Sequence, residues 1–222
     1  MNILYINGDK MEKKNKKNQT KSKFKYIYII AIIGILLDQT TKLLIEYEFN
    51  NSSCANDIVC IQAPCPSSCL SDLKNSGGIY HTFFHSFNVI PGKGIEIIKN
   101  FFYITEVKNT GAAWGMFSNN TVMLSVISII VTILLHIFLQ KETNLNKLSI
   151  TSYGFLFAGI IGNLIDRLFS GYVTDFLNFY IFGYDYPVFN IADILIVVGI
   201  ILMIIDVVRG EIYAYNKHKG KC

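Results

Sequence analysis

Two aspartates, Asp175 and Asp193, stand in separate segments of the chain, and apolar or aromatic residues surround both. Asp175 lies in the run GYVTDF (171–176), and Asp193 in the run FNIAD (189–193). A pair of carboxyl groups can hydrolyse an amide, because the ionised acid removes a proton from water while the protonated acid hydrogen-bonds the carbonyl oxygen. No Ser-His, Cys-His or metal-ligand cluster competes for this role, since the histidines are scattered: His81, His85, His136 and His218.

The two carboxyl groups are expected to share one proton, because like charges held close together cannot both ionise cheaply. The N-terminal dipole of a helix that begins at Asn190 favours the ionised form of Asp193, which predicts Asp193 as the initial base. Because such a pair titrates as a unit, Asp175 stays open as the alternative initial base. An alternative also explains Asn190 and Asp193: an N-cap followed three residues later by an acid is a common helix start.

Other polar residues stand where a membrane would not tolerate them without a partner. Asp38 and Lys42 are four residues apart, so they share one helix face and can form an ion pair there. Asn163 and Asp166 also share a face through their spacing, and Arg167 follows directly. A structural Asp-Arg pair that ends the helix is the alternative to a role in chemistry.

The elements that position these residues are predicted from four long apolar runs. The chain has 222 residues, of which 51% are hydrophobic, which is too apolar for an ordinary soluble domain. About 20 apolar residues cross the hydrocarbon core as a helix. Runs of that kind cover residues 26–47, 121–139, 149–169 and 190–208. The sequence therefore predicts an α-helical membrane protein with four transmembrane helices in one domain (26–208), between a basic tail (1–25) and a C-terminal tail (209–222).

The lysines report the orientation of these helices. The formal net charge is +4, yet the cations cluster before the first apolar run and after the last one, which argues against a nucleic-acid binder. Basic segments stay in the cytoplasm, so both termini and the turn at 140–147 are predicted inside. Segments 48–120 and 170–189 then lie outside, and the polar residues gather near that outer face.

The outer segments have features of their own. Residues 95–107 are β-branched and aromatic with a strand-like alternation, which predicts a small β-sheet on the membrane surface. Four cysteines in this part of the chain are expected to form two disulfides, with three possible pairings: Cys54, Cys60, Cys65 and Cys69. A zinc site is the weaker alternative, because the spacings give no paired C-x-x-C clasps and no histidine is interleaved. Cys222 is assigned no role.

Five motifs, in order along the chain, resemble those of the lipoprotein signal peptidases, or type II signal peptidases. The segment DQTTK (38–42) resembles D-x-x-x-K, and VKNTGAAWGMF (107–117) resembles V-x-N-x-G-A-A-x-x-x-F. The segments GNLIDR (162–167), GYVTDF (171–176) and FNIAD (189–193) are similar to G-N-x-x-D-R, G-x-V-x-D-F and F-N-x-A-D. Each motif alone is weak, but five in the expected order are a specific match.

The resemblance implies a membrane aspartic peptidase with four helices and a small outer sheet that cradles the substrate. Asp175 and Asp193 match the catalytic dyad. Positions that surround or orient the dyad or contact the lipopeptide are matched by Asp38, Lys42, Asn109, Gly111, Asn163, Arg167 and Asn190. Asp166 matches an acid that we interpret as structural support through Arg167. The substrates implied are diacylglyceryl-modified prolipoproteins, cut before the modified cysteine, with membrane lipid as the surroundings, a monomeric enzyme, and no metal, organic cofactor or nucleic acid.

One departure and two rival functions accompany this interpretation. Segment 49–94 is longer than the family's usual connection, and a tolerated surface insertion is favoured over a lid or a partner surface.

A transporter or proton channel also needs membrane acids, but its acids should spread through the bilayer depth. Four spans without inverted repeats are also few for a transporter. A scaffold protein leaves the converging carboxylates unexplained.

Overall fold

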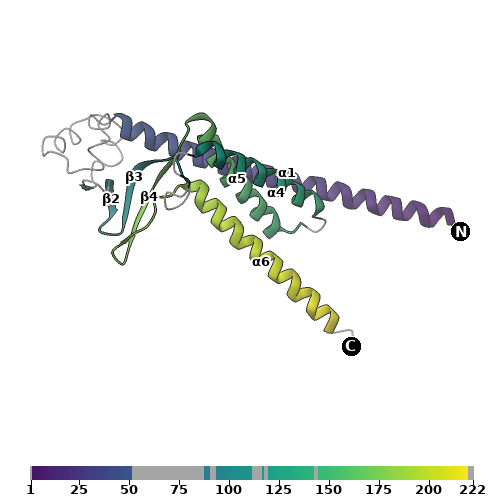
Figure 1. Ribbon diagram of the computed structural model, residues 1–222. Coiled ribbons are helices and arrows are strands. Elements are labelled where there is room, and N and C mark those ends of the chain that lie inside the picture. The colour runs from purple at the N-terminus through teal and green to yellow at the C-terminus, as the bar shows by residue number, and fades with distance from the viewer. Residues whose placement is uncertain are drawn as a thin grey trace. The chain divides into compact units, whose positions relative to one another are not determined.

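The structure is a computed structural model that describes residues 2–51, 88–90, 94–111, 117, 120–142 and 145–219 (Figure 1). Its helices are α1 (Asn2–Asn51), α4 (Thr121–Lys141), α5 (Lys147–Phe169) and α6 (Ile191–Lys219). Its strands are β1 (Asn88–Ile90), β2 (Gly94–Ile98), β3 (Phe102–Asn109), β4 (Val173–Ile181) and β5 (Tyr184–Asp185).

Four of the described helical segments are long and apolar enough to cross a membrane: Lys23–Phe49, Thr121–Lys141, Lys147–Phe169 and Ile191–Lys217. Each contains nearly all of one predicted run, so the four-span prediction is confirmed. The helices extend beyond the predicted runs at two ends, because α1 begins at Asn2 and α6 continues to Lys219. Most of the two predicted tails is therefore helical. The four cysteines at 54–69 and most of the insertion lie outside the described residues.

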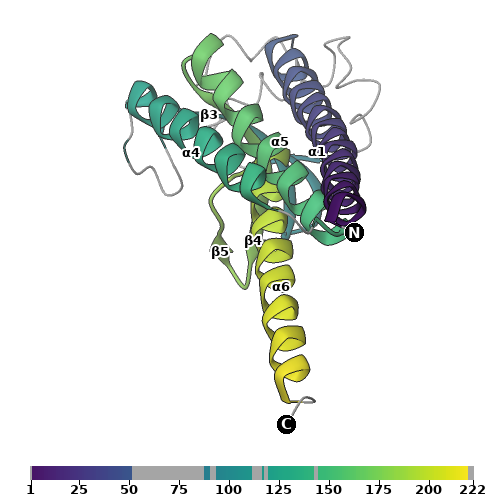
Figure 2. The ribbon, with the colours of Figure 1, turned by 90° about the vertical axis from the view of Figure 1, so that its right-hand side faces the viewer.

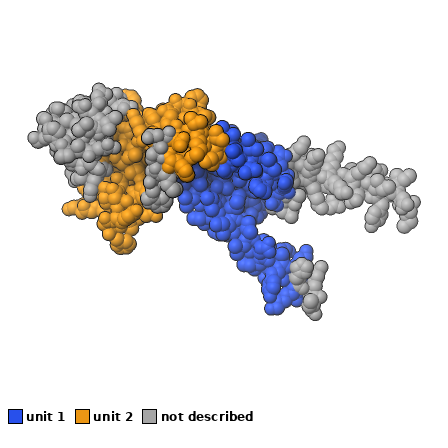
Figure 3. Space-filling model, viewed as in Figure 1, with its two compact units in different colours: residues 1–36, 128–162, 192–222 blue, residues 37–127, 163–191 orange. Residues whose placement is uncertain are grey.

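The chain divides into two compact units, drawn in different colours in Figure 3. Unit 1 contains residues 1–36, 128–162 and 192–222, and unit 2 contains residues 37–127 and 163–191. Each unit has its own apolar cluster, and the boundaries cut through the helices. The polar residues singled out in the sequence, except Asp193, belong to unit 2.

Unit 1 is built from helices that approach each other closely, and Figure 2 shows α1, α4 and α5 running alongside one another. Its buried cluster joins Ile27 and Ala31 of α1 to Leu139 and Phe157 of the next two helices. Glycines on α5 permit the close approach. A Cβ at Gly154 would lie 2.6 Å from the Ile30 side chain of α1, and one at Gly159 would lie 2.6 Å from that of Ile196 on α6. Small residues at such contacts are typical of helix packing in lipid.

Unit 2 contains an antiparallel sheet with the strand order β1-β2-β3-β4-β5. Its core is formed where the end of α1 meets the sheet, since Ile45 and Phe49 pack with Ile95, Ile104 and Phe176. The predicted strand at 95–107 is observed as a hairpin, β2 and β3, whose turn includes Asn100 with a φ of 55°. Asparagine tolerates that left-handed conformation better than most residues. The prediction of a small sheet is confirmed.

The strand β4 was not predicted, although it carries Asp175. It pairs with β3 along its length, and Val107 lies opposite Asp175. Its residues 173–181 are rich in β-branched and aromatic side chains, which is the signal that could have identified it. The backbone of Phe189 then pairs with Leu177 through hydrogen bonds of 2.8 and 3.2 Å. This pairing ties the segment before α6 to the same strand.

Candidate functional site

Asp175 is a buried carboxylate that receives two side-chain amides. Only 3% of its surface is exposed. The Asn109 Nδ2 of β3 donates to its Oδ2 at 2.9 Å, and the Asn190 Nδ2 donates to its Oδ1 at 2.6 Å. Hydrogen bonds from N–H groups to a carboxylate stabilise its negative charge and fix its orientation. Each oxygen of Asp175 therefore faces a donor that favours the ionised group.

Asn190 reaches Asp175 because of the strand pairing beside it. Phe189 is held to β4 by its backbone, and its ring stacks on Phe179 with centroids 5.6 Å apart. Asn190 is fully buried, and the same Nδ2 also donates to Asn163 Oδ1 at 3.1 Å. The amide of Asn190 thus joins the strand that carries the aspartate to the end of α5.

Lys42 is the centre of a buried charge cluster. Its Nζ lies 2.8 Å from Asp38 Oδ2 and 2.6 Å from Asp166 Oδ2, and it donates to Asn163 Oδ1 at 3.0 Å. Gln39 donates to Asp166 Oδ1 at 2.8 Å and to Asp38 Oδ2 at 3.2 Å. The ion pair predicted from the spacing of Asp38 and Lys42 is confirmed, and the lysine also binds α5. Lys42 is an ion-pair partner of Asp166, and the predicted support of Asp166 through Arg167 stays a prediction.

A second set of contacts returns from Asp175 to α5. Asn109 Oδ1 accepts a hydrogen bond from the Gly111 amide at 2.9 Å. Arg167 donates to the Gly111 carbonyl at 3.3 Å and to the Asn163 carbonyl at 3.4 Å. The contacts therefore form a closed ring from Asn163 through Asn190, Asp175, Asn109, Gly111 and Arg167 back to Asn163. A hydrogen-bond network of this kind holds its members in defined positions.

The structure thus brings together nine of the residues selected from the sequence: Asp38, Lys42, Asn109, Gly111, Asn163, Asp166, Arg167, Asp175 and Asn190. Asp193 stands in the first turn of α6, three residues after Asn190. Its carboxyl group belongs to unit 1, and its meeting with Asp175 stays a prediction. Within the described residues, no three His, Cys, Asp or Glu side chains form a group that could hold a metal ion.

Two contacts at the site were missed in the sequence. Gln39 lies inside the D-x-x-x-K motif at a position written as x, although its amide binds both acids beside Lys42. Glu46 of α1 accepts a hydrogen bond from Thr174, the neighbour of Asp175 on β4. Glu46 is eight residues after Asp38 and so lies near the same helix face, which is the signal that could have identified it.

Glu106 of β3 is a further acid in this region. Burial raises the pKa of Glu106 above its ordinary value of 4.5. The ammonium of Lys108, whose Nζ lies 3.8 Å from Glu106 Oε1, lowers this pKa, and the carboxylate of Glu46 raises it. Burial is the largest of these causes, so the pKa of Glu106 is raised overall.

Comparisons with known proteins identify the family. A sequence model described as signal peptidase (SPase) II matches residues 30–209. The lipoprotein signal peptidases of Staphylococcus haemolyticus (strain JCSC1435) and Staphylococcus aureus (strain JH9) are both 42% identical to this chain over 118 residues. Each alignment covers 53% of this chain, and the two alignments cover 75% and 72% of the respective relatives. Two solved structures of bacterial membrane enzymes, at 2.3 and 1.9 Å resolution, align with TM-scores of 0.57 and 0.54, at 32% and 31% identity. These alignments cover 82% of this chain in both cases, and 87% and 91% of the solved chains. Because the family match spans most of the chain, and the described parts of all five motifs surround one buried aspartate or open the helix beside it, the chain belongs to the signal peptidase II family.

Proposed function

We propose that this protein uses Asp175 and Asp193 as an aspartic dyad to remove signal peptides from diacylglyceryl-modified prolipoproteins. Membership of the signal peptidase II family makes it a peptidase, and its relatives are named for lipoprotein substrates. The observation that carries the proposal is the environment of Asp175, a buried carboxylate with an amide donor on each oxygen.

The amide donors favour Asp175 as the ionised member of the dyad. Two hydrogen bonds from amide N–H groups stabilise the negative charge of a carboxylate. In the proposed mechanism, Asp175 removes a proton from water and Asp193 donates its proton to the scissile carbonyl oxygen, while the hydroxide attacks the carbonyl carbon. Asp175 then passes its proton to the leaving amide nitrogen as the C–N bond breaks, and Asp193 recovers its own proton. Asp175 is thus proposed as the base in place of Asp193, which the helix dipole alone predicted.

The position of the scissile bond follows from the lipid on the substrate. A diacylated cysteine is held in the membrane by its acyl chains, so an active site at the membrane surface meets the bond just before that cysteine. We further propose that both termini lie in the cytoplasm and that the sheet and the dyad lie at the outer face, because the lysines of the N-terminal segment and of the α4–α5 turn favour this orientation.

The test uses the purified full chain with a diacylglyceryl-modified precursor and with the unmodified precursor. Asp175→Asn and Asp193→Asn are each expected to abolish cleavage while the thermal unfolding temperature changes little. Asp185→Asn is the matched control, because Asp185 is an exposed aspartate of β5 that contacts Tyr180 at 3.0 Å. The masses of the products give the cleavage position.

Near-normal turnover by either dyad variant would reject the dyad. Equal cleavage of the two precursors would reject lipid selectivity, and a product mass that leaves residues in front of the modified cysteine would reject the cleavage position.

A further inference from the structure

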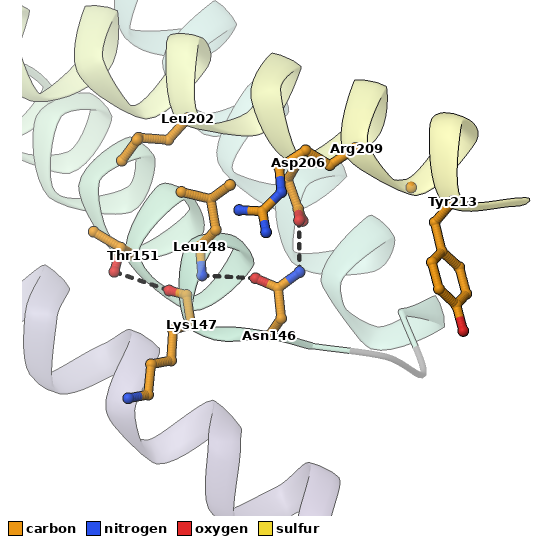
Figure 4. A pocket seen from close by; sticks show the side chains of 9 residues that line it. Asn146, Lys147, Leu148, Thr151, Leu202, Asp206, Arg209 and Tyr213 are labelled. Carbon is orange, nitrogen blue, oxygen red and sulfur yellow. Dashed lines mark hydrogen bonds between the residues drawn. The ribbon is translucent and has the colours of Figure 1, made fainter. Parts of the chain in front are cut away.

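A pocket of about 730 Å³ lies in unit 1, between the start of α5 and the last turns of α6 (Figure 4). It is far in sequence from the residues around Asp175. Lys147, Leu148 and Thr151 line it from α5, and Leu202, Arg209 and Tyr213 line it from α6. None of these residues has a part in the proposed reaction, so the pocket requires its own explanation.

The charged side chains of the pocket are unevenly paired. Asp206 is satisfied, since its Oδ1 accepts from Asn146 Nδ2 and its Oδ2 from Ser149 Oγ, both at 2.5 Å. Lys147 and Arg209 have no side-chain hydrogen bond or ion pair to any residue that the structure describes. Arg209 therefore lines the pocket beside one acid that is already bound, and Lys147 stands at the edge of the pocket with its flexible side chain turned toward α1 (Figure 4). Two cations against one bound acid favour an anionic ligand.

The helix start adds little to this site. The Asn146 Oδ1 already caps α5 by accepting from the amides of Leu148 and Ser149, at 2.7 and 3.1 Å. An anion in the pocket must therefore be recognised by the side chains of Lys147 and Arg209 rather than by free amides.

The place of the pocket along the helices identifies the kind of anion. Lys147 begins one candidate span, and Arg209 directly follows the apolar run 190–208 within another, so both cations lie beside the boundary of an apolar run. Leu148 and Leu202 give the same pocket an apolar part, and Tyr213 supplies an aromatic ring of the kind found where lipid headgroups meet the hydrocarbon. Basic pockets between transmembrane helices bind anionic headgroups.

We propose that this pocket binds the headgroup phosphate of an anionic phospholipid between Lys147 and Arg209, with the start of an acyl chain along Leu148 and Leu202. Arg209 supplies a planar fork of donors to the phosphate oxygens, and Lys147 supplies a flexible point charge. The ligand arrives with the membrane, so the site does not depend on the peptidase reaction.

The test is native mass spectrometry of the full-length protein in detergent, titrated separately with phosphatidylglycerol, phosphatidylcholine and inorganic phosphate. One phosphatidylglycerol is expected to be retained about tenfold more tightly than phosphatidylcholine, because the choline cation opposes Lys147 and Arg209. Inorganic phosphate should neither bind with comparable affinity nor displace the lipid. Displacement by inorganic phosphate would overturn the proposal in favour of a free-phosphate site, and equal retention of the two lipids would also overturn it.

Three variants locate the binding. Arg209→Gln is expected to weaken phosphatidylglycerol about tenfold, as loss of a charge-assisted contact does. Gly210→Leu fills the pocket without a change of charge, since a Cβ at Gly210 meets no atom within 4 Å, and should weaken the lipid to a similar extent in a fully folded protein. Lys217→Gln, which removes a charge from the same end of α6 outside the pocket, should have no effect.

Unchanged retention by Gly210→Leu would overturn the proposal even if Arg209→Gln failed to fold. An equal loss with Lys217→Gln would show attraction to the whole basic end of the helix and would also overturn it.

Discussion

At the scale of single residues, the site depends on amide side chains that each hold two partners. Asn190 donates both to Asp175 and to Asn163, and Asn109 both donates to Asp175 and accepts from Gly111. Neither asparagine carries charge or reaches the substrate in the proposed mechanism. Their role is to keep Asp175 in one orientation with its negative charge stabilised, so their removal should affect the rate more than substrate binding.

Asn190→Ala tests this role. Loss of a hydrogen bond to a charged group costs about 1.5–3 kcal/mol, so kcat should fall about ten- to hundredfold while KM changes little. Steady-state cleavage of a lipidated precursor provides both constants. Asn120→Ala, the same change at an exposed position before α4, should leave them unchanged. A rise in KM at constant kcat would mean that Asn190 binds substrate instead.

Glu106 gives a prediction about pH. Burial raises its pKa in the folded protein above the ordinary value of 4.5, so the folded state holds the proton more tightly than the unfolded chain. The associated stability is fully present below pH 4.5 and is lost as the pH rises through the higher folded pKa. Glu106→Gln should therefore be more stable than the wild type at neutral pH and lose this advantage at pH 4.

Thermal unfolding in detergent between pH 4 and pH 8 measures the difference between Glu106→Gln and wild type. Glu211→Gln is the control, because Glu211 is exposed on α6. A difference that is constant over the whole pH range would show that the effect of Glu106→Gln is not ionisation.

At the scale of elements, contact between α5 and α6 depends on the missing side chain of Gly159. Its Cβ would lie 2.6 Å from the side chain of Ile196, closer than such atoms approach. Gly159→Ala is expected to lower the thermal unfolding temperature, although alanine favours the helix itself. Gly210→Ala is the matched control on α6, where a Cβ meets nothing within 4 Å, and it should leave the unfolding temperature unchanged or raise it. An equal response of the two variants would show that the packing at Gly159 adapts freely.

The elements also show what the sequence could and could not predict. The four spans follow from composition alone, and the ion pair of Asp38 and Lys42 follows from helix periodicity, so both were predicted. The contact of Asn190 with Asp175 depends on Phe189 pairing with Leu177, twelve residues earlier, and no local pattern fixes such a pairing. Likewise, Lys42 meets Asp166 across 124 residues of chain, which is a product of helix packing rather than of spacing.

At the scale of the whole molecule, the main prediction to test is the side of the membrane on which the termini and the sheet lie. The lysine distribution predicts both termini inside and the sheet outside. After replacement of the five natural cysteines by serine, Phe182→Cys and Lys141→Cys each place one thiol at an exposed position. A membrane-impermeant maleimide applied to intact cells should label Phe182→Cys, and should label Lys141→Cys only after the membrane is opened. Reversed labelling would place the active site on the cytoplasmic side.

The shared cation at the centre of the site also limits how such a sequence can change over time. Lys42 balances Asp38 and Asp166 together, so exchange of the lysine for a neutral residue leaves two buried anions at once, at a cost of about 3–5 kcal/mol for each broken pair. Loss of one acid is a smaller step, because the other still holds the lysine. In the evolution of this family, Asp38 or Asp166 should therefore be replaced before Lys42 is. Homologues that lack the lysine while keeping both acids should be absent.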